Sequence, residues 1–169
     1  MMIEMRNTSQ KYHRRSIRLK DYDYSNDGAY FVTICAYQRR CLFGKMVKDN
    51  MKPNAYGRLA ELEWGKTAKL RNSVVLDTFV IMPNHVHGII FIRSRGVWQY
   101  APTKPRFHSP SQTIGAIVRG FKSAVTKQIN EIRHLPGAPV WQRNYYEHII
   151  RNEMDLHNVR MYIRNNPIN

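Results

Sequence analysis

Acidic side chains, cysteines and long apolar runs are all scarce in this sequence. Asp and Glu number 12 against 27 Lys and Arg, which gives a formal charge of +15. No apolar stretch reaches the ~18 residues that suggest a membrane span. The opening "MMIEMRNTSQKYHRRS" has no apolar core like that of a signal peptide. We therefore expect a cytoplasmic protein without membrane contact, with enough chain for one domain and a real core.

Cysteine usage argues against a disulfide framework and against a zinc knuckle. The two cysteines, Cys35 and Cys41, are separated by five residues, and no second pair exists. In a cytoplasmic protein we expect both to be reduced thiols at or near a strand. A structural zinc site that combines one of them with histidines remains an alternative.

The excess of positive charge is unevenly distributed. Residues 1–20 carry six basic side chains against one acid, and residues 93–106 carry four with no acid. Such an excess favours a polyanionic partner, most often nucleic acid. A solvated basic surface is the alternative. Anionic lipid competes less well, because no apolar helical face accompanies the basic runs.

Hydrophobic periodicity predicts an alternation of strands and helices. Dense β-branched and aromatic runs are typical of strands, and apolar residues three and four apart are typical of an amphipathic helix. Asn54 and Thr113 are the predicted helix caps. We expect strands at 29–37, 74–83 and 85–92, a short extended piece at 140–144, helices at 55–70, 114–132 and within 145–169, and a hairpin turn at Asp49-Asn50.

This order is that of an α+β, ferredoxin-like domain. We expect an antiparallel sheet like the palm of RNA-recognition domains, with helices on one face and an added C-terminal helix that carries a tyrosine pair. The single domain would span 29–169, with a basic arm at 1–28 and a flexible loop at 93–112. Because RNA-recognition domains share this architecture, the fold alone does not decide the function.

The stretch "MPNHVHGII", residues 82–90, contains two histidines separated by one residue. On a strand, His85 and His87 project to the same side, ~6–7 Å apart along the backbone, while Val86 faces the opposite core. Two imidazoles can hold one metal ion and leave positions open for water and substrate. We expect Gly88 to leave room for a substrate or backbone nearby. A pair of half-exposed sheet histidines is the alternative.

The stretch "VWQRNYYEHIIR" contains a second group of candidate site residues, a pair of adjacent tyrosines. On a helix, Tyr145 and Tyr146 would point ~100° apart. Tyr145 falls within the apolar stripe and Tyr146 at its edge, so Tyr146 is the better candidate for a cleft. A tyrosine phenolate can act as a nucleophile if a nearby cation helps it to ionise. The alternative is that both rings pack the helix onto the sheet.

These motifs together resemble a known family. "MPNHVHG" and "WQRNYYEHIIRNEMDLHNVRMYIRNNP", with "RRSIRLKDYDYSNDGAYFVTIC" and "FKSAVTKQIN", are similar to the REP-associated tyrosine transposases. These are single-tyrosine HUH nucleases, related to the transposases of small hairpin-ended insertion sequences. The similarity covers the chain from about residue 14 to the end.

The resemblance implies a divalent metal, Mg²⁺ or Mn²⁺, held by His85 and His87. Imidazole suits Mn²⁺ better than Mg²⁺, which prefers oxygen. It implies that Tyr146 attacks a single-stranded DNA phosphate, leaving a 5′-phosphotyrosine link and a free 3′-OH. The substrate would be a palindromic, hairpin-forming repeat with a tetranucleotide at its foot. We expect a nucleoid-associated bacterial protein, as a monomer or, alternatively, a dimer that exchanges its final helix.

The sequence departs from the related insertion-sequence transposases at one position. Those enzymes take a third metal ligand one helical turn after the tyrosine, and after Tyr146 that position is Ile150, which cannot coordinate. His148 or Glu147 is the predicted substitute, although a regular helix points His148 nearly opposite Tyr146. Water is the alternative.

Basic side chains in the arm and in the later helices are expected to contact DNA phosphates, which would make binding salt-dependent. Aromatic residues of the long loop, Trp98, Tyr100 and Phe107, are expected to stack on unpaired bases. A non-catalytic protein that binds hairpin DNA or RNA on the same fold is the alternative function. The predicted DNA-binding residues are Arg14, Arg15, Arg18, Lys20, Arg119, Lys122, Lys127 and Arg143.

Overall fold

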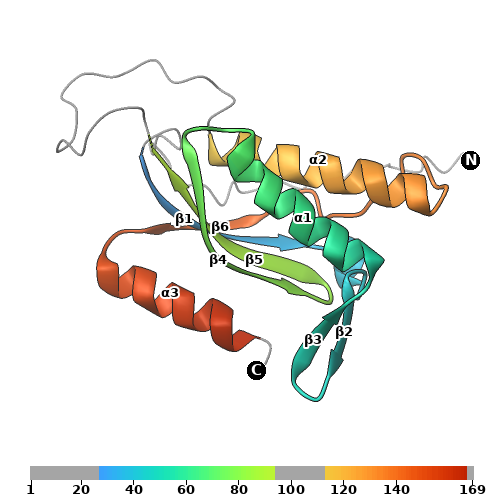
Figure 1. Cartoon of the computed structure of the whole chain (residues 1–169), viewed down its shortest axis with the longest axis horizontal. Helices are drawn as coiled ribbons and strands as arrows, with labels where there is room; N and C mark the ends of the chain where they lie inside the picture. Colours follow the sequence, from blue (N-terminus) through green and yellow to red (C-terminus); the bar gives the residue numbers. More distant parts are fainter. Residues whose placement is uncertain (1–26, 94–112, 167–169) are drawn as a thin grey trace, which may run out of the picture.

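The computed structural model describes residues 27–93 and 113–166 (Figure 1). The predicted basic arm and the predicted long loop lie almost entirely outside these residues. So do the aromatic side chains of the loop. Four of the predicted DNA-binding residues also lie outside the described part of the chain, namely Arg14, Arg15, Arg18 and Lys20.

The described residues form an α+β fold around a four-stranded antiparallel sheet with the strand order β4-β5-β1-β6. The sheet and two of its helices follow the β-α-β-β-α-β order of the ferredoxin-like arrangement. The elements are β1 (Gly28–Cys35), the 3-10 turn η1 (Tyr37–Arg39), β2 (Gly44–Val47), β3 (Asn50–Pro53), α1 (Ala55–Lys69), β4 (Val74–Met82), β5 (His85–Ile92), α2 (Ile114–Ile132), β6 (Tyr146–Ile150) and α3 (Glu153–Asn165).

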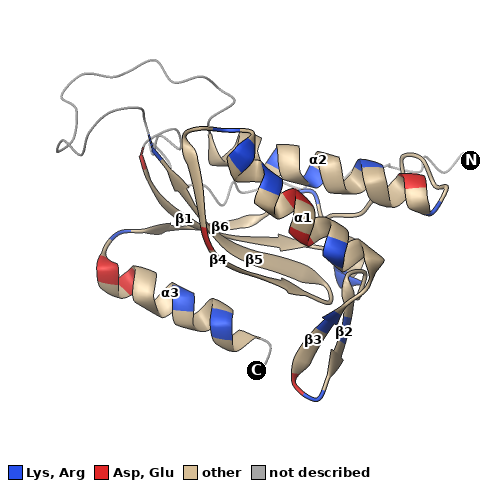
Figure 2. Cartoon of the chain, viewed as in Figure 1, with Lys and Arg blue, Asp and Glu red and all other residues tan. Residues whose placement is uncertain are grey.

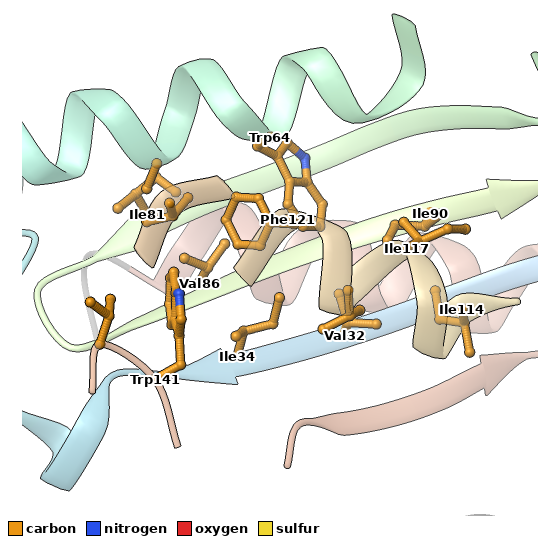
Figure 3. Packing of buried hydrophobic residues seen from close by; sticks show 14 of the residues in the cluster. Val32, Ile34, Trp64, Ile81, Val86, Ile90, Ile114, Ile117, Phe121 and Trp141 are labelled. Carbon is orange, nitrogen blue, oxygen red and sulfur yellow. The ribbon is translucent and has the colours of Figure 1, made fainter. Parts of the chain in front are cut away.

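The larger core lies between one face of the sheet and helices α1 and α2. Alternate residues of β1 and β5 point into it, and Figure 3 shows Val32, Ile34 and Val86 gathered with Trp64 and Phe121 of the two helices. Strand alternation explains this sorting, because every second side chain shares a face. The prediction that Val86 faces this core is confirmed, since its side chain is fully buried there.

Helix α3 packs on the opposite face of the sheet, which corrects the expectation that all helices share one face. Phe31 and Ile89 from the sheet join Leu156 and Ile163 of α3 in a second, smaller core. The two cores sandwich the sheet, so that β1 and β5 are buried on both faces (Figure 1). The reason is compositional: both central strands are apolar on each face, and a face left bare would cost burial energy.

The two predicted helix caps are confirmed. Asn54 Oδ1 accepts hydrogen bonds from the N–H groups of Tyr56 and Gly57 at 2.9 and 3.0 Å. Thr113 Oγ1 accepts one from the N–H of Ala116 at 3.2 Å. These side chains satisfy donors that have no partner inside the first turn of a helix.

The C-terminal segment differs from the prediction, because the helix there begins later. Residues Tyr146–Ile150 form the edge strand β6 and pair with β1, with Tyr146 opposite Thr33. The aromatic and β-branched run suits a strand that is half-buried. The helix starts at Glu153, where Asn152 Oδ1 accepts the Asp155 N–H at 2.8 Å. Tyr146 therefore lies on a strand and not on the C-terminal helix.

The short hairpin is confirmed, with its turn one residue earlier than predicted. Lys48 and Asp49 have φ values of 47° and 60°, and Val47 pairs with Asn50. Positive φ at both central residues defines the tight turn that matches the twist of a two-stranded ribbon. Within the described residues, no helix combines the length and the apolar character needed to cross a bilayer.

Gly88 shows how closely the larger core is packed, and it generates a prediction. A Cβ at Gly88 would lie 2.2 Å from Cζ2 of Trp64, whereas one at Gly65 would meet nothing within 4 Å. We expect Gly88→Ala to destabilise the fold by about 1–3 kcal/mol, because a rigid indole must move. The matched control Gly65→Ala, in an exposed part of α1, should gain about 0.5–1 kcal/mol. Urea unfolding measures both, and equal effects would contradict the packing argument.

Candidate functional site

The two histidines lie side by side on the face of the sheet that α3 covers. His85 is the first residue of β5, and the Nε2 atoms of His85 and His87 are 2.9 Å apart. Two imidazole ligands at right angles on one ion, with bonds of ~2.1 Å, would have nitrogens ~3.0 Å apart. The alternation of the strand therefore gives the separation that one shared ion requires.

The other ring nitrogen of each histidine has an oxygen partner. Nδ1 of His85 lies 2.6 Å from Oδ1 of Asn84, and Nδ1 of His87 lies 2.8 Å from Oγ1 of Thr33. An amide oxygen only accepts, so Nδ1 of His85 donates, and in the neutral ring Nε2 carries the lone pair. Metal-binding histidines are commonly oriented by such a partner on the second nitrogen.

Burial keeps both imidazoles neutral. Desolvation, reinforced by the nearby His85, lowers the pKa of His87 to about 3, and the residue is only 4% exposed. Desolvation also lowers the pKa of His85. A hydrogen bond to the Asn166 side chain opposes this shift, and the charge of Arg39 adds to it. Neutral imidazole is the form that binds a metal ion.

Gly88 does not open space beside the histidines, contrary to the prediction. It lies on the other face of β5, directly under the indole of Trp64. Because residues i and i+1 of a strand point to opposite faces, a glycine next to His87 faces away from it. Its missing side chain makes room for a core aromatic ring and not for a substrate.

Tyr162 of α3 reaches the histidine pair, although it is not among the predicted site residues. Its hydroxyl lies 3.5 Å from Nε2 of His87, and the two ring centroids are 5.3 Å apart. The ring also meets Phe31 edge-on at 6.0 Å, while 50% of the residue stays exposed. The result is a half-exposed phenol that two aromatic neighbours hold with its oxygen near His87.

Asn166 supplies a third polar group at the same place. It follows the last residue of α3, is half-buried, and its side chain hydrogen-bonds to His85. Tyr162 and Asn166 are four residues apart, which is one helical turn. This spacing was the signal in the sequence that could have identified both residues.

Tyr146 lies on the same face as the histidines but further away across the sheet. Thr33 of β1 pairs with His87 on one side and with Tyr146 on the other, so two strand spacings separate these residues. The Tyr146 ring touches the edge of Phe31 at 6.4 Å and is about half exposed. Tyr145 packs against the larger core, as predicted.

The predicted substitutes for the third ligand lie elsewhere. His148 shares a face with Tyr146, and its Nε2 is 3.0 Å from Oδ2 of Asp155 in α3. Glu147 alternates to the opposite face of β6 and pairs with Val32 of β1, which points into the larger core. The structure brings neither of them together with His85 and His87, whereas Asn166 is there.

The structural zinc alternative finds no cluster in the described part of the chain. Among residues 27–93 and 113–166, no three His, Cys, Asp or Glu side chains lie close enough to hold an ion. Cys41 is exposed, and Cys35 is partly buried on β1. Within these residues, the further oxygen donor found at the histidine pair is the side chain of Asn166.

The other four predicted DNA-binding residues come together on the opposite side of the sheet. Arg119, Lys122 and Lys127 of α2 and Arg143 line one groove of about 750 Å³. Lys122 is engaged within it, because its Nζ donates to the carbonyl of Gln142 at 2.5 Å and lies 3.4 Å from two further carbonyls. Arg119, Lys127 and Arg143 are exposed, and Figure 2 shows positive charge along α2.

An ion pair fixes the helix that carries Tyr162. The register of β4 shifts between Leu76 and Phe79, and Asp77, which contacts Arg160 of α3, lies within this irregularity. Oδ2 of Asp77 accepts from Nε and Nη2 of Arg160 at 3.0 and 2.5 Å. Burial opposes ionisation of Asp77, but the bonds from Arg160 and Thr78 outweigh it and lower the carboxyl pKa. The pair therefore stays charged at neutral pH.

We expect Asp77→Asn to loosen α3 selectively. Removing the charge should lower the free energy of local opening of α3 by about 1–2 kcal/mol, since solvent reaches part of the pair. Hydrogen exchange should rise at the amides of α3 and not at those of α1. The matched control is Glu131→Gln, because Glu131 and Lys127 form an exposed pair at 4.0 Å that contributes little. Uniform acceleration across all helices would contradict a local role.

Comparisons with known proteins show the fold and one relative of the chain. No protein-family model matches the chain. An uncharacterized protein of Haemophilus influenzae is 44% identical over 163 residues, which cover 93% of this chain and 89% of that protein. The structure of a REP-associated tyrosine transposase bound to a REP hairpin superposes with a TM-score of 0.60 at 18% identity, over 89% of this chain and 73% of that one. The chain therefore belongs to one family with the Haemophilus influenzae protein, and it has the fold of the REP-associated tyrosine transposase.

Proposed function

We propose that this protein is a metal-dependent endonuclease and strand transferase that acts on single-stranded DNA beside palindromic hairpins. The observation that carries the proposal is the approach of the Tyr162 hydroxyl to Nε2 of His87, 3.5 Å away, beside a second histidine and an amide. The similarity in fold to a transposase bound to a REP hairpin supports this class of substrate.

The donor set fits a divalent cation of the Mn²⁺ or Mg²⁺ class. His85 and His87 would offer neutral Nε2 atoms and Asn166 an amide oxygen, a mixture that Mn²⁺ accepts more readily than Mg²⁺. Three protein ligands leave positions for water and for phosphate oxygens. When bound, such an ion supplies electrophilic assistance to the scissile phosphate.

We infer that Tyr162, and not Tyr146, is the nucleophile. Its hydroxyl is the one found against the histidine pair, whereas Tyr146 lies two strands away from β5. The family resemblance places a metal ligand one helical turn after the tyrosine. Asn166 stands at that distance from Tyr162, while the same step from Tyr146 reaches Ile150. One reassignment thus accounts for both the nucleophile and the missing ligand.

The reaction is an exchange of one phosphodiester for another. Oη of Tyr162 attacks the phosphorus and gives up its proton to solvent; the residue is half exposed. The bond from phosphorus to the 3′ oxygen breaks, and that oxygen takes up a proton as a free 3′-OH. The 5′ phosphate stays on Tyr162 until a 3′-OH attacks in the reverse sense. No electrons are transferred to or from a third partner.

The basic groove gives the proposed substrate a second contact. Arg119 and Arg143 are exposed and can face phosphates, as can Lys127, whose exposed pair with Glu131 is long at 4.0 Å. Lys122 holds the segment from which Arg143 projects. Contacts of this kind position a nucleic acid and make its binding salt-dependent. We assign the groove to the DNA backbone and the histidine face to the chemistry.

The nucleophile is tested by covalent capture. Wild-type protein, Tyr162→Phe and Tyr146→Phe are each incubated with a single-stranded REP-type hairpin and Mn²⁺, and the adduct is measured on a denaturing gel. Tyr162→Phe should form none. Tyr146→Phe keeps its contact surface with Phe31 and should stay within about tenfold of wild type, a loss of ~1.4 kcal/mol or less.

The opposite pattern, with the adduct lost only in Tyr146→Phe, would return the role to Tyr146. If all three proteins bind the hairpin and none forms an adduct with either Mn²⁺ or Mg²⁺, the non-catalytic hairpin-binding alternative is correct.

Metal binding is tested without reference to activity. Thr33→Val removes the hydroxyl that orients His87, so the affinity for Mn²⁺, followed by the EPR signal of free Mn²⁺, should fall about 10–100-fold. Thr67→Val is the matched control, because Thr67 bonds only to the carbonyl of Glu63 within α1. An unchanged affinity in Thr33→Val, or an equal loss in the control, would contradict a site at His87.

A further inference from the structure

The two-stranded ribbon formed by β2 and β3, residues 44–53, stands apart from the main sheet. It makes a separate sheet of its own and projects beyond the end of the molecule (Figure 1). Its base is fixed: Phe43 is fully buried, and the N–H of Phe43 donates to the carbonyl of Pro83 at 2.9 Å. Asn54 Nδ2 donates to the carbonyl of Leu42 at 2.9 Å. These contacts anchor the base of the ribbon, so that the ribbon projects from a fixed point on the body.

The ribbon carries two lysines directly opposite each other. Lys45 pairs with Lys52 in the register of β2 and β3, and both are exposed. Like charges facing across an antiparallel pair destabilise it. No ion pair found in the described residues involves either lysine. The free protein therefore bears a repulsion that an anion placed between the two ammonium groups would relieve.

The lysines occupy the outer face of the ribbon. Met51 lies on the other face and packs against the larger core, so Lys52 and its partner are turned away from the body. Lys48 adds a third positive charge at the turn, and Figure 2 shows the cluster. Residues 37–58 contain six basic side chains and a single acid, Asp49. The ribbon itself contains no aromatic residue on which an unpaired base could stack.

The base of the ribbon adjoins the start of the histidine strand. The N–H of Phe43 bonds to Pro83, and the N–H of Ala36 bonds to the carbonyl of Asn84 at 2.8 Å, immediately before His85. The C-terminal end of α3 lies at the same end of the sheet (Figure 1). A nucleic acid held by the ribbon is thus held next to the candidate site.

We propose that the β2–β3 ribbon binds the duplex stem of the hairpin, with Lys45 and Lys52 on its phosphates. A two-stranded ribbon fits the groove of a duplex, and paired lysines without aromatic neighbours suit a phosphate backbone and not unpaired bases. This inference rests on the proposed function for its hairpin substrate, but it concerns binding of the duplex stem and not cleavage of the strand.

The test is equilibrium binding by the full chain carrying Tyr162→Phe, to avoid cleavage. The probes are a REP-type hairpin and an unstructured strand of the same length, over a range of salt concentrations. Lys45→Ala/Lys52→Ala should weaken hairpin binding about tenfold and make the salt slope shallower by about 2, one phosphate for each lysine. Binding to the unstructured strand should not change. Lys66→Ala/Lys69→Ala, with the same change of charge on α1, should match the parent on both probes.

A second variant separates binding from folding. Lys52→Glu turns the repelling pair into an attracting one, so the melting temperature of the free protein should rise while hairpin binding weakens. A ribbon with a purely structural role would not give these opposite responses. Unchanged hairpin affinity in the double variant, or an equal loss on both probes, would overturn the proposal. If the ribbon variants behave as expected while Tyr162 forms no adduct, stem binding stands and the strand-transfer function fails.

Discussion

The packing of α3 across the second face of the sheet is the contact on which the candidate site depends. It brings Tyr162 and Asn166 to histidines that lie some 75 residues earlier in the chain. The apolar part of this contact is small, with Leu156 and Ile163 as its buried side chains. Two polar contacts reinforce it, from His148 to Asp155 near its start and from Asp77 to Arg160 further along. The position of the helix that carries the tyrosine thus rests on polar contacts at its rim as well as on burial.

The same packing determines the state of the histidines. On a bare sheet face, His85 and His87 would be solvated and would titrate near their ordinary pKa. Beneath α3 they are desolvated and neutral, with their Nε2 atoms 2.9 Å apart. Thr33 and Asn84 hold the rings from the sheet side, so their orientation does not depend on the helix. The sheet and the helix therefore make separate contributions. The sheet orients the two imidazole rings, whereas α3 shields them from water and adds the Tyr162 phenol and the Asn166 amide.

Much of the fold and half of the site could be predicted from the sequence. The alternation in "HVHG" placed the histidines on one face, and Asn54 and Thr113 marked two helix starts, because these signals are local. The error at the C-terminus had a physical source: "YYEHII" lies between a loop and a true helix, and its extended form depends on pairing with β1. If that run is taken as helical, Tyr146 becomes the candidate tyrosine on the helix. The i, i+4 spacing of Tyr162 and Asn166 then goes unnoticed. The contact between α3 and β4 through Asp77 spans 83 residues, and no local pattern predicts it.

The two faces of the sheet carry different parts of the proposed function, DNA-backbone binding on one and strand cleavage on the other. The groove of α2 lies on one face and the histidines on the other, with a layer of strands buried on both sides between them. One DNA molecule can engage both only by passing around the edge or the end of the sheet. The ribbon stands at the end where β5 begins, with its lysines turned outward. A stem held there would deliver its unpaired foot to the histidine face and leave the flanking strand free to follow the charge toward α2. The repulsion between Lys45 and Lys52 in the free protein is then part of the arrangement, since binding relieves it.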